Sequence, residues 1–388
     1  MQKLAIITTH PIQYNAPFFK MLHERGNVDL KVFYTWSQTE KEKKFDPGFG
    51  INVDWDIPLL EGYDYCFSNN ISKNPSSGNF FGIDNPNLIK EIKASSPDAI
   101  LLYGWSFKSH LKTLFHFAKK VPILFRGDST LLDEQKGIKT LLRRVWLKFI
   151  YSKIDFAMYA GLANKNYFLA HGLNAAQLIF MPHAIDNTRF KQDDDITSKA
   201  NELRNSLNIG KEERVFLFVG KLEPKKNPSI LIDILLKSNL NCHLMFVGNG
   251  ILEQELKDSC SKSTNIHFLG FQNQSKMPII YAASNVFILP SNGPGETWGL
   301  AINEAMAAGK AVIVSSACGA ALDLVKENGF IFEKNNIAEL KEKFSFFMSN
   351  KNAAVEMGNK SLELIEEYSF EKDCIAIENT LILIENRN

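Results

Sequence analysis

The chain has 388 residues, 45% of them hydrophobic, and a formal net charge of +1 at pH 7. This length exceeds what one hydrophobic core usually supports, so two domains are expected, and the nearly balanced charge gives no general argument for nucleic-acid binding. The cysteines are widely scattered, which argues against a disulfide framework or a paired zinc site and favours a reducing compartment: Cys66, Cys242, Cys260, Cys318 and Cys374.

The N-terminal half alternates apolar runs with polar loops. Residues 4–8 and 29–34 predict buried strands, with a helix from about residue 16 to residue 24 between them. This order is typical of a parallel sheet, whose ligands bind beyond the carboxyl ends of the strands. The apolar run at residues 4–7 is too short for a signal peptide, and no later run is long enough to span a bilayer, so we expect a cytoplasmic protein.

Further buried strands are predicted at residues 98–103 and 121–125. The polar and aromatic residues that follow the predicted strands are candidate ligand contacts: His10, Gln13, Tyr14, Trp105, Arg126 and Asp128. Polar loops follow strands in any Rossmann-like domain, however, and Arg126 and Asp128 could simply pair with each other. The sequence leaves both interpretations of these residues open.

Residues 38–82 are polar and irregular, and they predict a long excursion at the edge of the first domain. This stretch contains Asp54-Trp55-Asp56, and a second acidic triplet occurs at residues 193–195. Such triplets can hold a divalent cation. Neither follows a convincing buried strand, so we expect no metal site.

Residues 136–153 carry six basic residues and no acidic residue. Apolar residues are interleaved with them at helical spacing: Leu142, Val145, Trp146, Phe149 and Ile150. A basic amphipathic helix of this kind can lie on an anionic membrane surface, which would place the protein at the inner face of the cell membrane. The alternative is a helix that packs on the sheet and leaves a solvated basic face.

A second alternating set of strands and helices begins after the charged stretch near residue 190. One strand at residues 215–219 ends in Gly220 and Lys221, and Lys226 follows in the next loop. Two ammonium groups at this spacing could offset the charge of a diphosphate without a metal ion. Solvated loop lysines are the alternative for this pair.

Residues 293–316 predict a glycine-rich loop that delivers Glu296, a helix from about residue 297 to residue 308, and a buried strand at 311–314. The N-terminus of such a helix suits an anion. Glu296 and Glu304 lie on either side of this N-terminus, separated by at most about 12 Å of helix rise. The alternative is that Glu296 belongs to the helix cap and Glu304 is a solvated helix residue.

Glu296 and Glu304, after Pro290 and Ser291, resemble the Glu-x7-Glu signature of the family 4 retaining glycosyltransferases with the GT-B fold. Gly220-Lys221-Leu222 with Lys226 is similar to the Gly-Arg-Leu…Lys motif of that family, with lysine in place of the commoner arginine. Three other segments also resemble the family pattern: Gly270-Phe271, Tyr281-Ala282-Ala283 and the stretch from Gly319 to Asp323. The resemblance covers nearly all of the second half of the chain.

The resemblance implies an α/β fold with two Rossmann-like domains, whose parallel sheets face each other across a cleft. Residues 1–188 would form the acceptor domain, completed by a C-terminal helix at 370–388, and residues 189–369 would form the donor domain. Arg126-Gly127-Asp128 stands where a histidine is common in the family, and HPIQYNAP replaces the usual Gly-Gly loop after the first strand. The acceptor therefore stays open.

The resemblance also implies roles for individual residues. Lys221 and Lys226 would hold the donor diphosphate, Glu296 would contact the hydroxyls of the transferred sugar, and Glu304 would accept hydrogen bonds from the ribose. The remaining donor-binding residues would be Gly220, Phe271, Thr297, Trp298, Gly299 and Leu300. Of these, the backbone of residues 298–300 would face the distal phosphate, and Phe271 would lie beside the base.

The expected function is a metal-independent, retaining hexosyltransferase that needs no cofactor. It would move a sugar from a nucleotide-sugar donor, with UDP as the expected nucleotide, to a glycan or lipid-linked glycan acceptor in polysaccharide biosynthesis. Two alternatives are a nucleotide-sugar epimerase of the same fold and a non-catalytic module that binds a nucleotide or a glycan. A nicotinamide-dependent dehydrogenase is disfavoured because no Gly-x-Gly-x-x-Gly follows the first strand.

Overall fold

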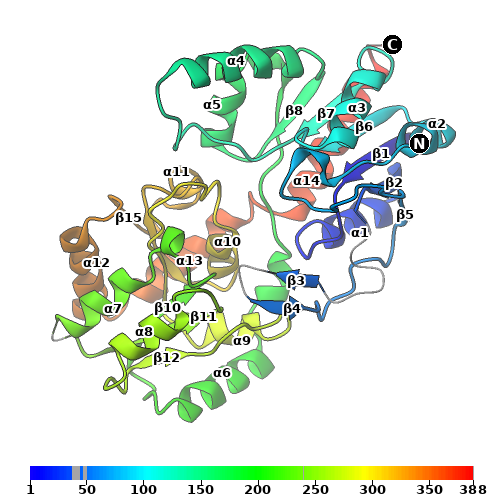
Figure 1. Cartoon of the computed structure of the whole chain (residues 1–388). Helices are drawn as coiled ribbons and strands as arrows, with labels where there is room; N and C mark the ends of the chain where they lie inside the picture. The colour runs from blue at the N-terminus through cyan, green and yellow to red at the C-terminus, as the bar shows by residue number, and fades with distance from the viewer. Residues whose placement is uncertain (37–43, 47–49, 239, 388) are drawn as a thin grey trace. The chain divides into compact units, whose positions relative to one another are not determined.

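The computed structural model describes residues 1–36, 44–46, 50–238 and 240–387 (Figure 1). The chain divides into two compact units. The first comprises residues 1–44, 58–182 and 370–388, and the second comprises residues 45–57 and 183–369. The predicted boundary after residue 188 differs from this division, because the second unit begins at His183 and includes part of the excursion predicted to belong to the first domain.

The first unit is built on a parallel sheet with the strand order β5-β2-β1-β6-β7-β8-β9. Its strands are β1 (Gln2–Thr8), β2 (Val28–Tyr34), β5 (Asp64–Phe67), β6 (Ala99–Tyr103), β7 (Ile123–Arg126), β8 (Phe156–Tyr159) and β9 (Leu178–Phe180). Its helices are α1 (Ala16–Glu24), α2 (Leu88–Ser95), α3 (Lys108–Phe117), α4 (Ile138–Tyr151), α5 (Leu162–Ala170) and α14 (Phe370–Glu385).

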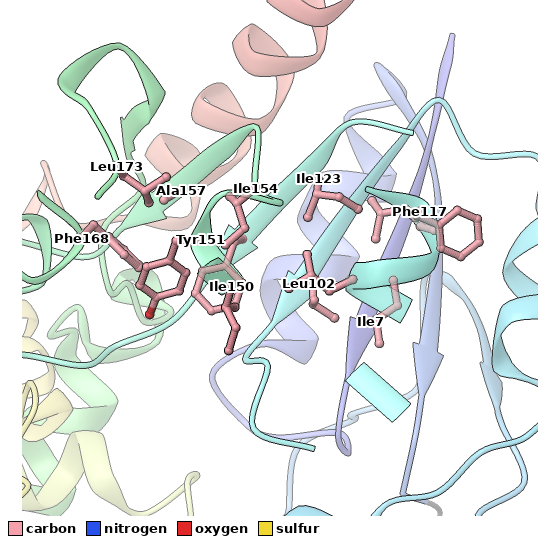
Figure 2. Packing of buried hydrophobic residues seen from close by; sticks show 14 of the residues in the cluster. Ile7, Leu102, Phe117, Ile123, Ile150, Tyr151, Ile154, Ala157, Phe168 and Leu173 are labelled. Carbon is pink, nitrogen blue, oxygen red and sulfur yellow. The ribbon is translucent and has the colours of Figure 1, made fainter. Parts of the chain in front are cut away.

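One core cluster of the first unit lies between the sheet and helices α2, α3, α4 and α5 (Figure 2). Ile7, Leu102 and Ile123 project from β1, β6 and β7, and Tyr151 of α4 and Phe168 of α5 pack into the same cluster. All five side chains are at most 2% exposed. Because these strands are covered by helices, they are apolar almost throughout, and the sequence could show them as continuous apolar runs.

The C-terminal helix α14 packs with α1 in the first unit. Arg25, just after α1, donates to both oxygens of Glu378 at 2.7 and 2.8 Å and to Glu371 at 2.6 Å. The rings of Phe18 and Phe370 lie 6.2 Å apart. Hydrophobic packing and a bidentate ion pair therefore fasten the last helix to the first, although the two are far apart in the sequence.

The second unit contains a parallel sheet with the strand order β12-β11-β10-β13-β14-β15. Its strands are β10 (Arg214–Val219), β11 (Cys242–Val247), β12 (Ile266–Phe268), β13 (Val286–Leu289), β14 (Ala311–Ser315) and β15 (Gly329–Phe332). Its helices are α6 (Asp194–Ser206), α7 (Ser229–Leu236), α8 (Glu253–Ser259), α9 (Met277–Ala282), α10 (Leu300–Ala307), α11 (Ala321–Leu324), α12 (Ile337–Ser349) and α13 (Ala353–Ile365). A separate ladder joins β3 (Lys44–Asp46) and β4 (Ile51–Val53).

Both sheets are parallel and both units alternate strands with helices, so the predicted α/β class is confirmed. The helix predicted to begin near Thr297 instead begins at Leu300, with Gly299 as its N-cap in a left-handed conformation at φ 99°. Residues before Gly299 are held in a loop, because the N–H groups of Gly319 and Ala320 donate to the carbonyls of Glu296 and Trp298.

Candidate functional site

The loops after β10, β11 and β12 pack backbone against backbone at the carboxyl edge of the second sheet. The Gly220 N–H donates to Val247 at 3.0 Å, and the Gly248 N–H donates to Gly270 at 2.8 Å. A Cβ at Gly248 would lie 2.2 Å from the carbonyl oxygen of Gly220, so only glycine permits this approach. These contacts bring the predicted Gly220-Lys221 and Gly270-Phe271 segments to one edge, where parallel sheets bind their ligands.

Lys226 and Glu296 form an ion pair at this edge. The Nζ of Lys226 lies 2.5 Å from Oε2 of Glu296, and Ser291 donates its hydroxyl to the same oxygen at 2.9 Å. The Glu296 and Lys226 side chains are only 7% and 17% exposed. Two residues predicted independently, one from each motif, are therefore in direct contact, and Lys226 is not a solvated loop lysine.

Two further residues of the second unit are relevant to this ion pair. Lys221 is half-buried just beyond the end of β10. Cys318 is 2% exposed, and burial, followed by the nearby Glu296 carboxylate, raises the pKa of its thiol. The thiol is therefore kept neutral beside the charged pair.

The N-terminus of α10 follows directly after Glu296. Gly299 is the N-cap, and no side-chain hydrogen bond caps the helix, so Glu296 does not itself cap α10. The loop is held rigid from both sides: Trp298 donates from Nε1 to Asn303 at 2.8 Å, and Asn303 donates to the carbonyl of His183 at 2.8 Å. The first amides of a helix lack intrahelical acceptors, so this end of α10 can bind a negatively charged group.

Glu304, within α10, is also buried. It is 3% exposed and accepts a hydrogen bond from the hydroxyl of Tyr281 at 2.8 Å. The alternative in which Glu304 is a solvated helix residue is therefore wrong. The same hydroxyl lies 3.2 Å from the carbonyl of Ala301, which fixes the tyrosine against the first turn of α10. The sequence did not indicate this partnership, because Tyr281 belongs to α9.

The segment after β12 has an unexpected neighbour from the N-terminal half of the chain. The ring of Trp55 lies 6.2 Å from the ring of Phe271. The neighbouring Asp56 fixes the Trp55 segment, because its carboxylate accepts hydrogen bonds from the backbone N–H of Ser275 at 3.2 Å and from the Ser275 hydroxyl. The Asp54-Trp55-Asp56 triplet thus contacts the segment that the resemblance places beside the nucleotide base, and the sequence provided no signal for it.

The candidate residues of the first unit have different environments. His10 shares a hydrogen bond of 2.9 Å with Thr9, and its ring meets Trp36 edge-on at 5.2 Å. Gln13 and Tyr14 are half-buried in the loop after β1, and Trp105 packs against the core cluster.

Arg126 has a role that the sequence did not indicate. It is 6% exposed, and its guanidinium donates to the carbonyls of Met158, Met181 and Pro182. The guanidinium therefore stabilises the ends of β8 and β9, whereas Asp128 is exposed two residues later. Burial raises the pKa of Asp373 on α14 well above its ordinary value, and the nearby Arg126 opposes this shift.

His110 is a buried polar residue that the sequence did not indicate. It is fully buried, shares a 2.9 Å hydrogen bond with the Thr35 hydroxyl, and contacts the carbonyls of Tyr103 and Gly104 at 3.0 and 3.1 Å. Burial lowers the pKa of its imidazole to about 4. The ring is therefore neutral at physiological pH and cross-links the carboxyl ends of β2 and β6.

Across residues 1–36, 44–46, 50–238 and 240–387, no cluster of three or more histidine, cysteine, aspartate or glutamate side chains could hold a metal ion. Within the same residues, none of the helices has the length and hydropathy needed to cross a bilayer.

The matching family and two relatives of this chain are all glycosyltransferases. Residues 199–363 match the family Glycosyl transferases group 1. An uncharacterized glycosyltransferase of Methanocaldococcus jannaschii is 25% identical over 320 residues, covering 74% of this chain and 89% of the relative. The UDP-Gal:alpha-D-GlcNAc-diphosphoundecaprenol alpha-1,3-galactosyltransferase of Escherichia coli is 32% identical over 167 residues, covering 40% of this chain and 41% of that protein.

The fold also has solved counterparts. Sucrose-phosphate synthase from Thermosynechococcus elongatus superimposes with a TM-score of 0.76 at 17% identity, with all of both chains covered. The predicted GT-B fold is confirmed by this likeness together with the two parallel sheets. Glycosyl transfer, the coarser part of the predicted function, is supported by the family match and by the relatives.

Proposed function

We propose that this chain is a retaining glycosyltransferase of family 4 that moves a hexose from a UDP-linked donor to a glycan or lipid-linked glycan. The observation that carries the proposal is the contact between Lys226 and Glu296 beside the N-terminus of α10. A cation, an uncapped helix N-terminus and a buried carboxylate at one edge of a sheet suit a ligand with both phosphate and hydroxyl groups.

The donor binds at the second unit in this proposal. Lys221, Lys226 and the amides at the start of α10 hold the diphosphate, and Glu296 accepts hydrogen bonds from the sugar hydroxyls. Glu304, oriented by Tyr281, accepts hydrogen bonds from the ribose. Because an ammonium group has three donors, Lys226 can keep its contact with Glu296 while it binds a phosphate oxygen.

Catalysis then rests on stabilising the leaving group. The bond between the anomeric carbon and the phosphate oxygen breaks as the bond to the acceptor hydroxyl forms on the same face. The leaving phosphate takes the acceptor proton, so no protein nucleophile is required. Lys221, Lys226 and the helix N-terminus offset the negative charge that builds on the diphosphate, which gives a metal-independent reaction.

The UDP-linked donor and the lipid-linked acceptor are the finer parts of this proposal. Both draw support from the Escherichia coli relative, whose name specifies UDP-Gal and a diphosphoundecaprenol acceptor. A lipid-linked acceptor would bring the enzyme to the inner face of the cell membrane, with its bulk in the cytoplasm. A role in polysaccharide biosynthesis follows from an acceptor of this class.

The test is acceptor-dependent release of UDP from a panel of UDP-sugars. The wild-type protein is expected to release UDP and form a product with the donor's anomeric configuration, with and without EDTA. Glu296→Ala and Lys226→Ala are expected to abolish transfer, whereas Glu255→Ala and Lys237→Ala, at exposed positions of the same unit, keep it. Near-normal turnover in either site variant would refute the assignment, as would epimerisation of the donor without an acceptor or binding of UDP without turnover.

A further inference from the structure

Helix α4 has two apolar faces, and the core uses only one of them. Leu147, Ile150 and Tyr151 are at most 2% exposed and pack into the core cluster. On the opposite side lies a row of exposed apolar residues, here called the outer row: Ile138 (78% exposed), Leu141 (64%), Leu142 (66%), Val145 (63%), Trp146 (44%) and Phe149 (48%). A helix on the surface of a globular protein normally turns polar residues to that side, so this outer row requires an explanation.

The outer row is continuous and extends to a neighbouring helix. The rings of Trp146 and Phe149 lie 5.7 Å apart, and the ring of Phe115 on α3 lies 5.6 Å from that of Phe149. Phe115 is itself 37% exposed. The apolar surface is therefore a patch that spans two helices rather than a set of isolated side chains.

Basic residues flank the outer row on both sides. At about 100° per residue, Lys139 falls on one side of the row and Lys148 on the other. Both are exposed, as is Lys136 just before the helix. The segment from residue 136 to residue 153 contains no acidic residue.

We propose that this face of α4 docks on the surface of an anionic lipid bilayer, with the outer row inserted among the acyl chains and the flanking cations on the headgroups. An interfacial helix needs this combination of a Leu/Trp/Phe face and basic flanks. A second copy of the chain is a poorer partner, because pairing the same face on two copies would bring the basic flanks of both together.

This docking does not depend on the proposed glycosyl transfer, since it uses none of the residues placed in the donor site. It corrects one detail of the predicted amphipathic helix. Ile150, grouped in the sequence with Leu142, Val145, Trp146 and Phe149, belongs to the core, whereas the exposed Ile138 and Leu141 join the outer row. It also shows that the helix packs on the sheet, as the alternative required, yet its outer face is apolar rather than purely basic.

The test is co-sedimentation with vesicles in the absence of any nucleotide sugar. We expect the wild-type protein to sediment with equimolar phosphatidylglycerol and phosphatidylcholine, and to bind pure phosphatidylcholine at least about tenfold more weakly. Lys139→Glu with Lys148→Glu should lower binding by about fivefold or more for each lysine removed. The matched control, Lys237→Glu with Lys262→Glu, changes exposed lysines of the second unit and should bind like the wild type.

The apolar contribution is tested separately with Leu142→Ser, Val145→Ser and Trp146→Ser combined. Because these side chains are exposed, the variant should keep its melting temperature and lose binding by about tenfold or more. The control combines Ile251→Ser, Leu322→Ser and Val355→Ser, which are 78%, 62% and 63% exposed in the second unit, and should bind normally.

The proposal is overturned if the wild type stays in the supernatant with anionic vesicles at low salt, or if the outer-row variant binds like its control. It is also overturned if sedimentation velocity without lipid shows a dimer that the outer-row substitutions dissociate, because a second copy would then cover this face.

Discussion

The ion pair between Lys226 and Glu296 leads to a prediction that can be checked before any substrate is known. The test is a double-mutant cycle with Lys226→Met and Glu296→Gln, which remove the charges and keep most of the volume. Removing one partner of a buried ion pair leaves the other charge uncompensated, at a cost of about 3–5 kcal/mol. Lys226 keeps 17% exposure and Ser291 still donates to Glu296, so Lys226→Met should cost about 3 kcal/mol, at the low end of that range.

Glu296→Gln should cost less, about 1–2 kcal/mol, because water can partly solvate the remaining ammonium group. The double variant has no unpaired charge, so its loss should fall below the sum of the single losses by at least about 1 kcal/mol. The free energy of unfolding is measured by chemical denaturation, followed through tryptophan fluorescence, to which Trp298 in the same loop as Glu296 contributes.

Turnover provides the second readout of the cycle. Each single variant and the double variant should lose about 10²–10³-fold in kcat, since a charge-stabilising group has gone in each case. Unfolding losses that add to within about 0.3 kcal/mol would refute the ion pair in the resting protein. A Lys226→Met variant with unchanged kcat would refute the role of Lys226 at the leaving group.

Three further predictions follow from other hydrogen-bonded polar groups. Tyr281→Phe removes the hydroxyl that donates a hydrogen bond to Glu304 at 2.8 Å. In steady-state kinetics the variant should show a KM for the nucleotide sugar about tenfold higher with little change in kcat, and an unchanged KM would contradict the orienting role. Burial lowers the pKa of His110 to about 4, below its unfolded value of about 6.5, so unfolding binds a proton and up to about 3 kcal/mol of stability is lost as pH falls from 6.5 to 4. The denaturation midpoint of the His110→Gln variant should lack this pH dependence, and an acid profile like that of the wild type would contradict the prediction. The hydrogen bond from Arg25 lowers the pKa of Glu378, so this pair stabilises the protein above the unfolded pKa of that carboxyl and ceases to do so as pH falls through the lowered value. Arg25→Ala should cost about 1–2 kcal/mol at pH 7 and reduce the dependence of the melting temperature on pH below pH 4.5. An unchanged melting temperature at pH 7 would argue against this role.

The parts of the site that were predicted from sequence are those with a local signal. Apolar strands buried on both faces appear as continuous runs, so the alternation of strands and helices could be predicted in both halves of the chain. Gly220 and Gly299 adopt φ values of 155° and 99°, and glycine at a strand end or before a helix is a visible mark of such turns. The spacing of Glu296 and Glu304 on one short loop and helix was equally visible.

The structure supplied what depends on contacts between distant segments. No local pattern could indicate that Lys226 forms an ion pair with Glu296 or that Tyr281 donates a hydrogen bond to Glu304. The contact between the rings of Trp55 and Phe271 joins residues from different halves of the chain and was equally invisible. The start of α10 was misplaced for the same reason, since the residues before Gly299 bond to the loop at 319–320 instead of extending the helix.

Helix α4 shows most clearly which properties come from the sequence and which come from tertiary packing. Its sequence determined that basic and apolar residues alternate at helical spacing, because that property belongs to the order of the residues alone. Which apolar residues face the core depends on how the helix is rotated against the sheet, and a helix with apolar residues on two opposite faces permits either rotation. Packing of Leu147, Ile150 and Tyr151 into the core cluster selected one of these rotations and left the outer row exposed.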